Sequence, residues 1–230
     1  MKNLVVLSGS GISKESGIST FRDTDGLWQE YDPRELATVE ALLNNTEKVL
    51  EFYNLRRETM WNAEPNSAHL CLVSLEEKYN VQIITQNVDD LHERGGSSNI
   101  LHLHGQLNQV RSSNNENIVK NVAKGEKVNI GDLAEDGSQL RPDVVLFGEP
   151  VPRMEEAIEI TKKADILIVI GTSLQVYPAA ELIEYTNENC ETYIIDPEIP
   201  NISKRKNMYF LNSKATLGLP KLVQKLIEDL

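Results

Sequence analysis

Leu4-Val5-Val6-Leu7-Ser8-Gly9-Ser10-Gly11-Ile12-Ser13-Lys14-Glu15-Ser16-Gly17 is the stretch that decides the fold. Its four consecutive apolar residues, two of them valine, predict a strand of a parallel sheet covered on both faces. Gly9 and Gly11 lack β-carbons where the backbone turns sharply and a ligand can come close. Amides at the start of a helix near Ser13 could hold a pyrophosphate. The pattern G-x-G-x-x-G would place a third glycine at Lys14, so the turn alone does not identify its ligand.

The composition indicates an ordinary globular protein. The chain has 230 residues, of which 40% are hydrophobic and 25% charged, enough for one large domain or a domain with a small inserted module. The net charge of −12 and the absence of a basic groove pattern argue against a nucleic-acid partner. That charge would favour a basic peptide partner, although solubility explains it equally well.

Cysteine use and hydropathy limit the location of the protein. Cys71 and Cys190 are the only cysteines, which excludes a four-cysteine metal site, argues against a disulfide framework and favours a cytoplasmic location. The longest apolar stretch, 166–170, is too short to span a membrane. The first residues lead directly into the strand and leave no room for a signal peptide. No pattern in the sequence predicts an oligomeric state.

Strands and helices alternate along the chain, which predicts an α/β fold around a mostly parallel sheet. Residues 106–140 are polar and rich in turns, which indicates a protruding module. Ligands of such sheets bind beyond the carboxyl ends of the strands, where polar clusters occur at 8–11, 86–89, 104–105, 171–173 and 196. We predict strands at 4–7, 81–85, 100–104, 144–147, 165–170 and 192–195, and helices near 13, at 33–43, 46–60, 65–78, 151–163, 178–189 and from 220.

Five groups of motif residues follow one another along the chain. They are Gly9-Ser10-Gly11-Ile12-Ser13 with Glu15-Ser16-Gly17-Ile18 and Thr20-Phe21-Arg22; Thr85-Gln86-Asn87-Val88-Asp89 with Leu91-His92; Leu103-His104-Gly105; Arg141-Pro142 with Val144-Val145 and Phe147-Gly148-Glu149; and Gly171-Thr172-Ser173-Leu174 with Val176 and Pro178. Together, and in this order, they resemble the signature motifs of the sirtuin family.

The resemblance implies a Rossmann-like parallel sheet with helices on both faces, and a smaller inserted module beside an acyl-lysine cleft. One catalytic domain would cover 1–230, with the Rossmann part at about 1–24, 80–105 and 141–230 and the small module at about 25–79 and 106–140. The implied reaction consumes NAD: nicotinamide leaves, the acyl oxygen attacks C1′ of the ribose, and a histidine base activates a ribose hydroxyl. Unmodified lysine, nicotinamide and an O-acyl-ADP-ribose are the implied products.

His104 matches the catalytic histidine of the family. Imidazole suits this role because its usual pKa of about 6.5 leaves much of it neutral at physiological pH. Without the complete motif set, the same residue would be interpreted as a structural polar group that ends a strand.

The resemblance also implies which residues bind NAD. Gln86, Asn87 and Asp89 match groups that hold the nicotinamide ribose and the carboxamide, with a solvated turn as the alternative interpretation. The other expected contacts are Gly9, Ser10 and Gly11 at the pyrophosphate, with Ser10 where the family usually has alanine; Glu15 and Thr20 in the opening motif; Phe21 and Arg22 in the loop over the nicotinamide ribose, and Trp28 beyond it; Gly171, Thr172 and Ser173 on the adenosine side; Asp196 in place of a more usual asparagine; and Ala215 near the adenine.

Tyr53 and Arg56 lie three residues apart, hence on one face of a predicted helix. They resemble the Tyr-x-x-Arg signature of the class III sirtuins, which remove acidic acyl groups such as succinyl, malonyl and glutaryl. A guanidinium can bind a carboxylate through two hydrogen bonds, and a phenol can add a third. Ala37 matches the small residue that leaves room for the longer acyl chain. The alternative interpretation is an amphipathic helix with a solvated Arg56-Arg57 pair.

Val145, Phe147 and Gly148 match the segment along which the substrate peptide of the family adds as a strand. Such addition gives affinity through backbone hydrogen bonds and demands little of the peptide sequence. An ordinary core strand would explain Val144 and Val145, but not the Gly148-Glu149 ending.

Most sirtuins hold the small module together with four zinc-binding cysteines, and here the matching positions are Ser112, Asn115, Leu133 and Asp136. Without thiolates, and with a leucine that cannot bind metal, we expect no zinc. We expect apolar contacts to hold the module instead, from Ile118, Val119, Val122, Val128, Ile130 and Leu133.

The leading hypothesis is an NAD-dependent protein-lysine deacylase, a sirtuin-type transferase, with preference for acidic acyl groups. Its partners would be acyl-lysine proteins or peptides, with no nucleic acid and no membrane. An NAD hydrolase or ADP-ribosyltransferase is the first alternative, but neither needs the Tyr53 and Arg56 pair. A non-catalytic sensor of NAD or ADP-ribose is the second, but binding alone would not need His104.

Overall fold

A six-stranded parallel sheet is the larger part of the computed structural model, which describes residues 1–20, 36–200 and 202–228. The strand order β3-β2-β1-β7-β8-β9 reverses direction between β1 and β7, where α/β sheets bind their ligands. Ser8 at the end of β1 lies opposite both Thr85 and Ile170, so the turns after β1, β2 and β7 meet at one edge. The strands are β1 (Asn3–Ser8), β2 (Asn80–Thr85), β3 (Ile100–His102), β7 (Ile166–Ile170), β8 (Glu191–Asp196) and β9 (Met208–Asn212).

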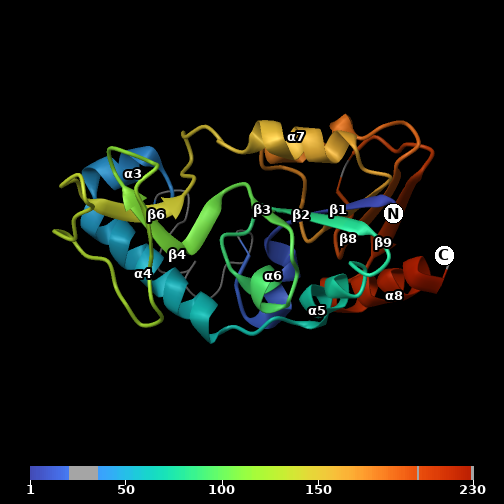
Figure 1. Ribbon diagram of the computed structural model, residues 1–230, viewed down its shortest axis with the longest axis horizontal. Helices are drawn as coiled ribbons and strands as arrows, with labels where there is room; N and C mark the ends of the chain where they lie inside the picture. The colour runs from blue at the N-terminus through green and yellow to red at the C-terminus, as the bar shows by residue number, and fades with distance from the viewer. Residues whose placement is uncertain (21–35, 201, 229–230) are drawn as a thin grey trace.

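Side chains of β1 alternate between two apolar layers, as the period of a strand requires. Leu4 and Val6 pack with α5 (Ser67–Val73) and α8 (Ala215–Glu228) on one face of the sheet. Val5 and Leu7 pack on the other face with α7 (Met154–Lys162) and the 3-10 helix η3 (Ala179–Tyr185). Figure 1 shows α7 above the sheet and α5 and α8 below it. The predicted α/β fold with helices on both faces is confirmed.

A second, antiparallel sheet of three strands forms a separate module, seen on the left of Figure 1. Its order is β5-β4-β6, and α3 and α4 pack beside it. Pro142 lies within β6, where a missing N–H is tolerated because β6 is an edge strand. The elements are α3 (Val39–Asn44), α4 (Thr46–Asn62), β4 (Gly105–Ser112), β5 (Val119–Asn121) and β6 (Leu140–Val144).

The strands predicted at 4–7, 81–85, 165–170 and 192–195 are confirmed, as are the helices predicted at 46–60 and 151–163. The strand predicted at 100–104 is shorter, because the chain leaves β3 after His102 and enters β4 at Gly105. Gly105 has a φ of 77°, and a β-carbon there would lie 2.0 Å from the Asp143 carbonyl oxygen, so only glycine fits this turn.

Three helix predictions are wrong in type or length. Near Ser13 the chain forms two short 3-10 helices, η1 (Ser10–Ile12) and η2 (Lys14–Ser16), ended by Gly17 at a φ of 90°. The helix predicted at 178–189 is the 3-10 helix η3. The helix predicted at 65–78 ends as α5 at Val73 and continues as turns.

Other boundaries also differ. The strand predicted at 144–147 is wrong beyond its first residue, because β6 ends at Val144 and the chain then leaves the sheet. Of the helix predicted at 33–43, residues 33–35 lie outside the described residues, and α3 begins at Val39 after Thr38 caps it through the Ala41 N–H. Strands β4, β5 and β9 were not predicted.

The last helix begins at Ala215, and Pro220 lies inside it rather than at its start. A proline cannot donate to the carbonyl four residues earlier, which here belongs to Thr216. The Ser67 hydroxyl of α5 donates to that carbonyl at 3.1 Å, so the helix continues past the proline.

The short helix α6 (Leu91–Arg94) follows the turn after β2 and leads toward β3. None of the described helices is both long and apolar enough to cross a membrane. The division of the chain into a Rossmann part and a small module, with the boundaries given above, stays a prediction.

Candidate functional site

A cavity of about 700 Å³ opens at the carboxyl ends of the parallel strands and extends to the small module. Phe21, Arg22 and Trp28 lie outside the described residues. All the other residues expected at the site line this cavity: Gly9, Ser10, Gly11, Glu15, Thr20, Ala37, Tyr53, Arg56, Gln86, Asn87, Asp89, His104, Val145, Phe147, Gly148, Gly171, Thr172, Ser173, Asp196 and Ala215.

The glycine turn after β1 packs directly on the turn after β7. The Gly11 N–H donates to the Gly171 carbonyl at 2.8 Å, and a β-carbon on Gly9 would lie 2.7 Å from the same oxygen. The glycines are therefore needed for two backbones to approach each other, which joins the two turns into one polar floor. Because the glycines carry no side chains, a pyrophosphate could come close to this part of the backbone.

The segment after β2 carries three polar side chains toward the cavity. Asn87 donates from Nδ2 to Ser13 Oγ at 3.2 Å, and the Ser13 hydroxyl donates to Asp89 Oδ2 at 3.0 Å. Gln86 donates to the Thr172 hydroxyl at 3.1 Å and so reaches the turn after β7. Asn87 and Asp89 are buried, which argues against a merely solvated turn.

Burial raises the pKa of the Asp89 carboxyl. Hydrogen bonds from the Leu91 N–H and the Ser13 hydroxyl oppose this shift, because they favour the charged form. Asp89 is thus a desolvated acceptor whose remaining capacity suits ligand hydroxyls.

His104 lies on the short connection between β3 and β4, at the wall of the cavity. Its Nδ1 donates to the Gln86 carbonyl at 3.0 Å, which fixes the neutral tautomer with a lone pair on Nε2. Burial lowers the pKa of His104 below its usual value, and the bond to Gln86 opposes this in part. The imidazole is therefore a base that stays neutral near pH 7.

Tyr53 and Arg56 face the module side of the cavity from α4. Tyr53 is only 2% exposed, and the Arg56 guanidinium lies 5.5 Å from the centre of its ring. Burial raises the pKa of Tyr53 and lowers that of Arg56, and each group's charge opposes the shift of the other. The pair presents a partly desolvated cation with a phenol beside it.

The alternative of a solvated Arg56-Arg57 pair is wrong for Arg57, which is 1% exposed. Its Nε donates to the Leu107 carbonyl at 2.7 Å and one terminal nitrogen donates to Asn54. Burial lowers the pKa of Arg57 to about 10. Arg57 thus joins α4 to β4, whereas Arg56 faces the cavity.

Ala37 lies beside the segment that follows β6. The Phe147 N–H donates to the Ala37 carbonyl at 2.8 Å, and the Val145 N–H donates to the His104 carbonyl at 2.9 Å. These bonds make Phe147 a wall of the cavity while its side chain stays half exposed.

Sequence reasoning missed the ion pair that holds this segment. Arg141 donates to both carboxylate oxygens of Glu149, at 2.6 and 3.1 Å, and Glu149 also accepts from the Leu146 N–H. Burial raises the pKa of Glu149, but these hydrogen bonds outweigh it and hold the pKa below its usual value. The two residues lie eight apart, so no local pattern indicated that they would meet.

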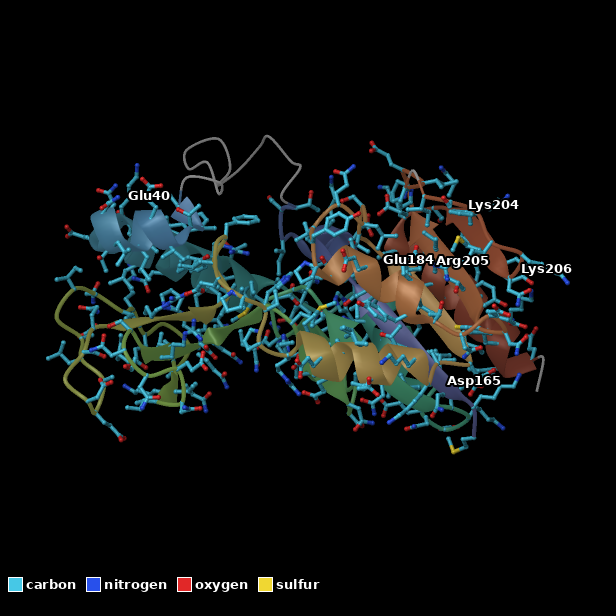
Figure 2. The ribbon with its side chains drawn as sticks, turned by 90° about the horizontal axis from the view of Figure 1, so that it is seen from above. Glu40, Asp165, Glu184, Lys204, Arg205 and Lys206 are labelled. Carbon is cyan, nitrogen blue, oxygen red and sulfur yellow. The ribbon has the colours of Figure 1, made fainter. Side chains whose placement is uncertain are left out.

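Charged groups also line the cavity beyond the residues expected there, among them Lys14 and Lys214. Asp196, at the end of β8, accepts from the Glu198 N–H at 2.8 Å. The short basic segment 204–206 lies elsewhere, on the outer side of the parallel-sheet part, where Arg205 pairs with Glu184 (Figure 2).

The positions that match the zinc cysteines form a hydrogen-bonded cluster. The Ser112 hydroxyl donates to Asp136 at 2.6 Å, accepts from the Asn114 and Asn115 N–H groups, and lies 2.7 Å from the Ser138 hydroxyl. The fourth position, Leu133, is 58% exposed and takes no part. Across residues 1–20, 36–200 and 202–228, no group of three or more His, Cys, Asp or Glu is arranged to hold a metal ion.

The expected apolar contacts of the module are only partly present. Val122 and Val128 are buried with Leu50, Val110 and Leu140. Ile118 is partly buried, whereas the expectation is wrong for Val119, Ile130 and Leu133, which are exposed. Hydrogen bonds such as those of Ser112 satisfy this loop locally instead.

Comparisons with known proteins agree with the geometry. Residues 9–178 match the Sir2 family. An NAD-dependent protein deacylase of Helicobacter pylori (strain ATCC 700392 / 26695) is 54% identical over 228 residues, covering 99% of each chain. Another, of Bacteroides thetaiotaomicron, is 48% identical over 231 residues with the same coverage.

Solved structures are similar over nearly the whole chain. The crystal structure of a Sir2 homolog–NAD complex superposes with a TM-score of 0.90 at 39% identity, covering 99% of this chain and 90% of the other. A Sir2 mutant with a p53 peptide and NAD superposes with a TM-score of 0.79 at 29% identity, covering 99% and 92%.

Proposed function

The chain belongs to the Sir2 family, and from that premise we propose that it is an NAD-dependent protein-lysine deacylase with preference for acidic acyl groups. The observation that carries the proposal is the meeting in one cavity of a neutral base, a buried Asn–Asp pair and an arginine–tyrosine pair. Desuccinylation, demalonylation or deglutarylation would each use all three.

NAD would lie along the cavity. Gly9, Gly11 and Gly171 carry no side chains, so a pyrophosphate could come close to the joined turns, and Asp196 could accept hydrogen bonds from the adenosine ribose. Gln86, Asn87 and Asp89 would hold the nicotinamide ribose and carboxamide. NAD supplies an electrophilic ribose carbon when nicotinamide leaves.

His104 would then act as a general base. Its Nδ1 is engaged by Gln86, which leaves the Nε2 lone pair to take a proton from a ribose hydroxyl. As nicotinamide leaves, the acyl oxygen of the substrate lysine would bond to the ribose carbon, and the activated ribose hydroxyl would then attack the acyl carbon. Breakage of the C–N bond, with one water consumed, would release free lysine and an O-acyl-ADP-ribose.

The acyl group would extend toward Tyr53 and Arg56. The guanidinium can bind a terminal carboxylate, and Ala37 leaves space beside it. The segment at Val145, Phe147 and Gly148, held by Arg141 and Glu149, would pair with the backbone of the substrate peptide.

Turnover of matched acetyl-, succinyl- and glutaryl-lysine peptides with NAD, followed by mass spectrometry, tests the proposal. We expect Arg56→Met to lower kcat/KM for the succinyl peptide about 10- to 100-fold, since a charge-assisted hydrogen bond contributes about 1.5–3 kcal/mol. Turnover of the acetyl peptide should change little. Arg153→Met, at the exposed N-cap of α7, is the matched control. Equal or better turnover of the acetyl peptide by the wild type would contradict the acidic preference.

His104→Ala should lower deacylation about 10²- to 10⁴-fold, the usual contribution of a general base. As the pH is lowered, kcat/KM of the wild type should fall only below about pH 6.5, because the depressed pKa keeps His104 neutral to lower pH. A pH profile of kcat/KM measures this. Nicotinamide release without an acyl acceptor would instead indicate an NAD hydrolase, and binding of NAD without any turnover would indicate a sensor.

A further inference from the structure

His102 lies two residues before His104 but does not line the cavity. It is the last residue of β3 and is 6% exposed. Its Nδ1 lies 3.2 Å from the Asn87 carbonyl oxygen, and its Nε2 lies 2.6 Å from Glu93 Oε1 on α6. The imidazole therefore bridges the segment after β2 and the short helix that follows it, which lies beside β3 in Figure 1.

Both partners of His102 are acceptors. A carbonyl oxygen and an ionised carboxylate carry no proton to donate, so both ring nitrogens must carry hydrogen. His102 and Glu93 thus form a close pair, and their 2.6 Å contact is short, as charge-assisted hydrogen bonds are. Glu93 is 39% exposed, so its carboxylate keeps contact with water while the ring is enclosed.

The contact with His102 engages the Asn87 carbonyl, and other groups bind the rest of Asn87. The Asn87 N–H donates to the Thr85 hydroxyl at 3.0 Å, and the Thr85 oxygen also accepts from Ser8. The Asn87 side chain is bonded to Ser13, as described above. With its carbonyl held by His102, Asn87 is bound at its amide, its carbonyl and its side chain, and the Ser13 hydroxyl that accepts from the side chain donates in turn to Asp89.

We propose that His102 and Glu93 are positioning residues for the reaction: their ion pair holds the Asn87 carbonyl and so sets Asn87 and Asp89 against the nicotinamide ribose. The inference rests on the proposed function, because it assigns the ribose to these side chains. The charge of His102 acts in the same direction, since it opposes the rise in the pKa of Asp89 that burial causes. His92 and Asp89 are the other titratable groups whose charges interact with His102.

Glu93 is a better position for substitution than the buried His102, because Glu93 is on the surface and its replacement leaves no cavity. Glu93→Ala should raise KM for NAD about tenfold, because the variant loses the hydrogen bond that orients His102 and a net hydrogen bond corresponds to about tenfold in affinity. KM for the acyl peptide should stay within about twofold of the wild-type value. Glu93→Gln should recover most of the loss, since its amide can donate to a neutral His102 that still donates to Asn87. Glu77→Ala, another exposed glutamate, is the matched control.

Affinity for NAD, measured by calorimetry, separates this inference from the proposed function. If the wild type binds NAD but does not deacylate, the function fails, and a tenfold weaker affinity of Glu93→Ala for NAD still supports the positioning role. A lower Tm of Glu93→Ala with unchanged KM and affinity for NAD would show a purely structural role and overturn the inference. Equal increases in both KM values, or no rescue by Glu93→Gln, would overturn it as well.

Discussion

The parallel-sheet part and the small module are stabilised in different ways. Strand β7 is buried along its whole length between two apolar layers. The module has smaller apolar clusters, and its long loop exposes Val119, Ile130 and Leu133 while Ser112 and Asp136 bond to each other. Apolar burial thus stabilises the parallel sheet, whereas local hydrogen bonds stabilise much of the module loop.

The same substitution in both parts is the strongest test of this difference. Leu167→Ala in β7 should lower the free energy of unfolding by about 4–5 kcal/mol, near the top of the range for a buried leucine, because the site cannot collapse. Leu140→Ala in β6 should cost only about 2 kcal/mol, since Leu140 belongs to a small apolar cluster. Urea unfolding measures both values, and equal losses would break the comparison.

The second-largest effect is expected in the polar cluster around Ser112 in the module. Ser112→Ala removes the acceptor of two backbone N–H groups, which should cost about 1–3 kcal/mol locally. Hydrogen exchange of the Asn114 and Asn115 amides should therefore become faster, while amides of β7 keep their protection. Ser113→Ala, at the exposed neighbouring serine, is the control and should leave exchange unchanged.

Acid should loosen the module loop before the sheet. Hydrogen bonds from Ser112 and then Ser138 lower the pKa of Asp136 below its usual value of 3.8. A lowered pKa in the folded state stabilises the loop fully above pH 3.8, and this contribution is lost as the pH falls through the lowered value. Exchange of the Asn115 amide measured against pH should show the loss. The dependence should flatten in Asp136→Asn, and an unaltered profile in that variant would count against the cluster.

Removal of metal should have the smallest effect, namely none. We expect no stoichiometric zinc by elemental analysis, and unchanged Tm and activity after treatment with a chelator. Stoichiometric zinc would mean that the module is held by metal after all, and the contrast drawn above would be reversed.

The same contrast explains what the sequence could predict. Residues 166–170 are apolar in succession, and this local signal predicted β7 correctly. Ser112 and Asp136 carry no local signal, because their bond depends on how the loop closes. Pro220 indicated a helix start, but the hydroxyl of Ser67, far away in sequence, lets the helix begin earlier.

The candidate site followed the same rule. His104, Asn87 and Asp89 belong to contiguous motifs at strand ends, so their meeting could be predicted from the parallel order of the strands. The pairs Arg141–Glu149 and His102–Glu93 form only in three dimensions. Sequence spacing places neither pair, since their partners come from different elements.

The position of His104 between the two sheets has a mechanical consequence. Only two residues separate the end of β3 from the start of β4, and the chain turns at Gly105. Any movement of the module relative to the parallel sheet would therefore displace the imidazole. The hydrogen bond from His104 to the Gln86 carbonyl would oppose that displacement. The position of the imidazole in the cavity therefore depends on how the module sits against the parallel sheet.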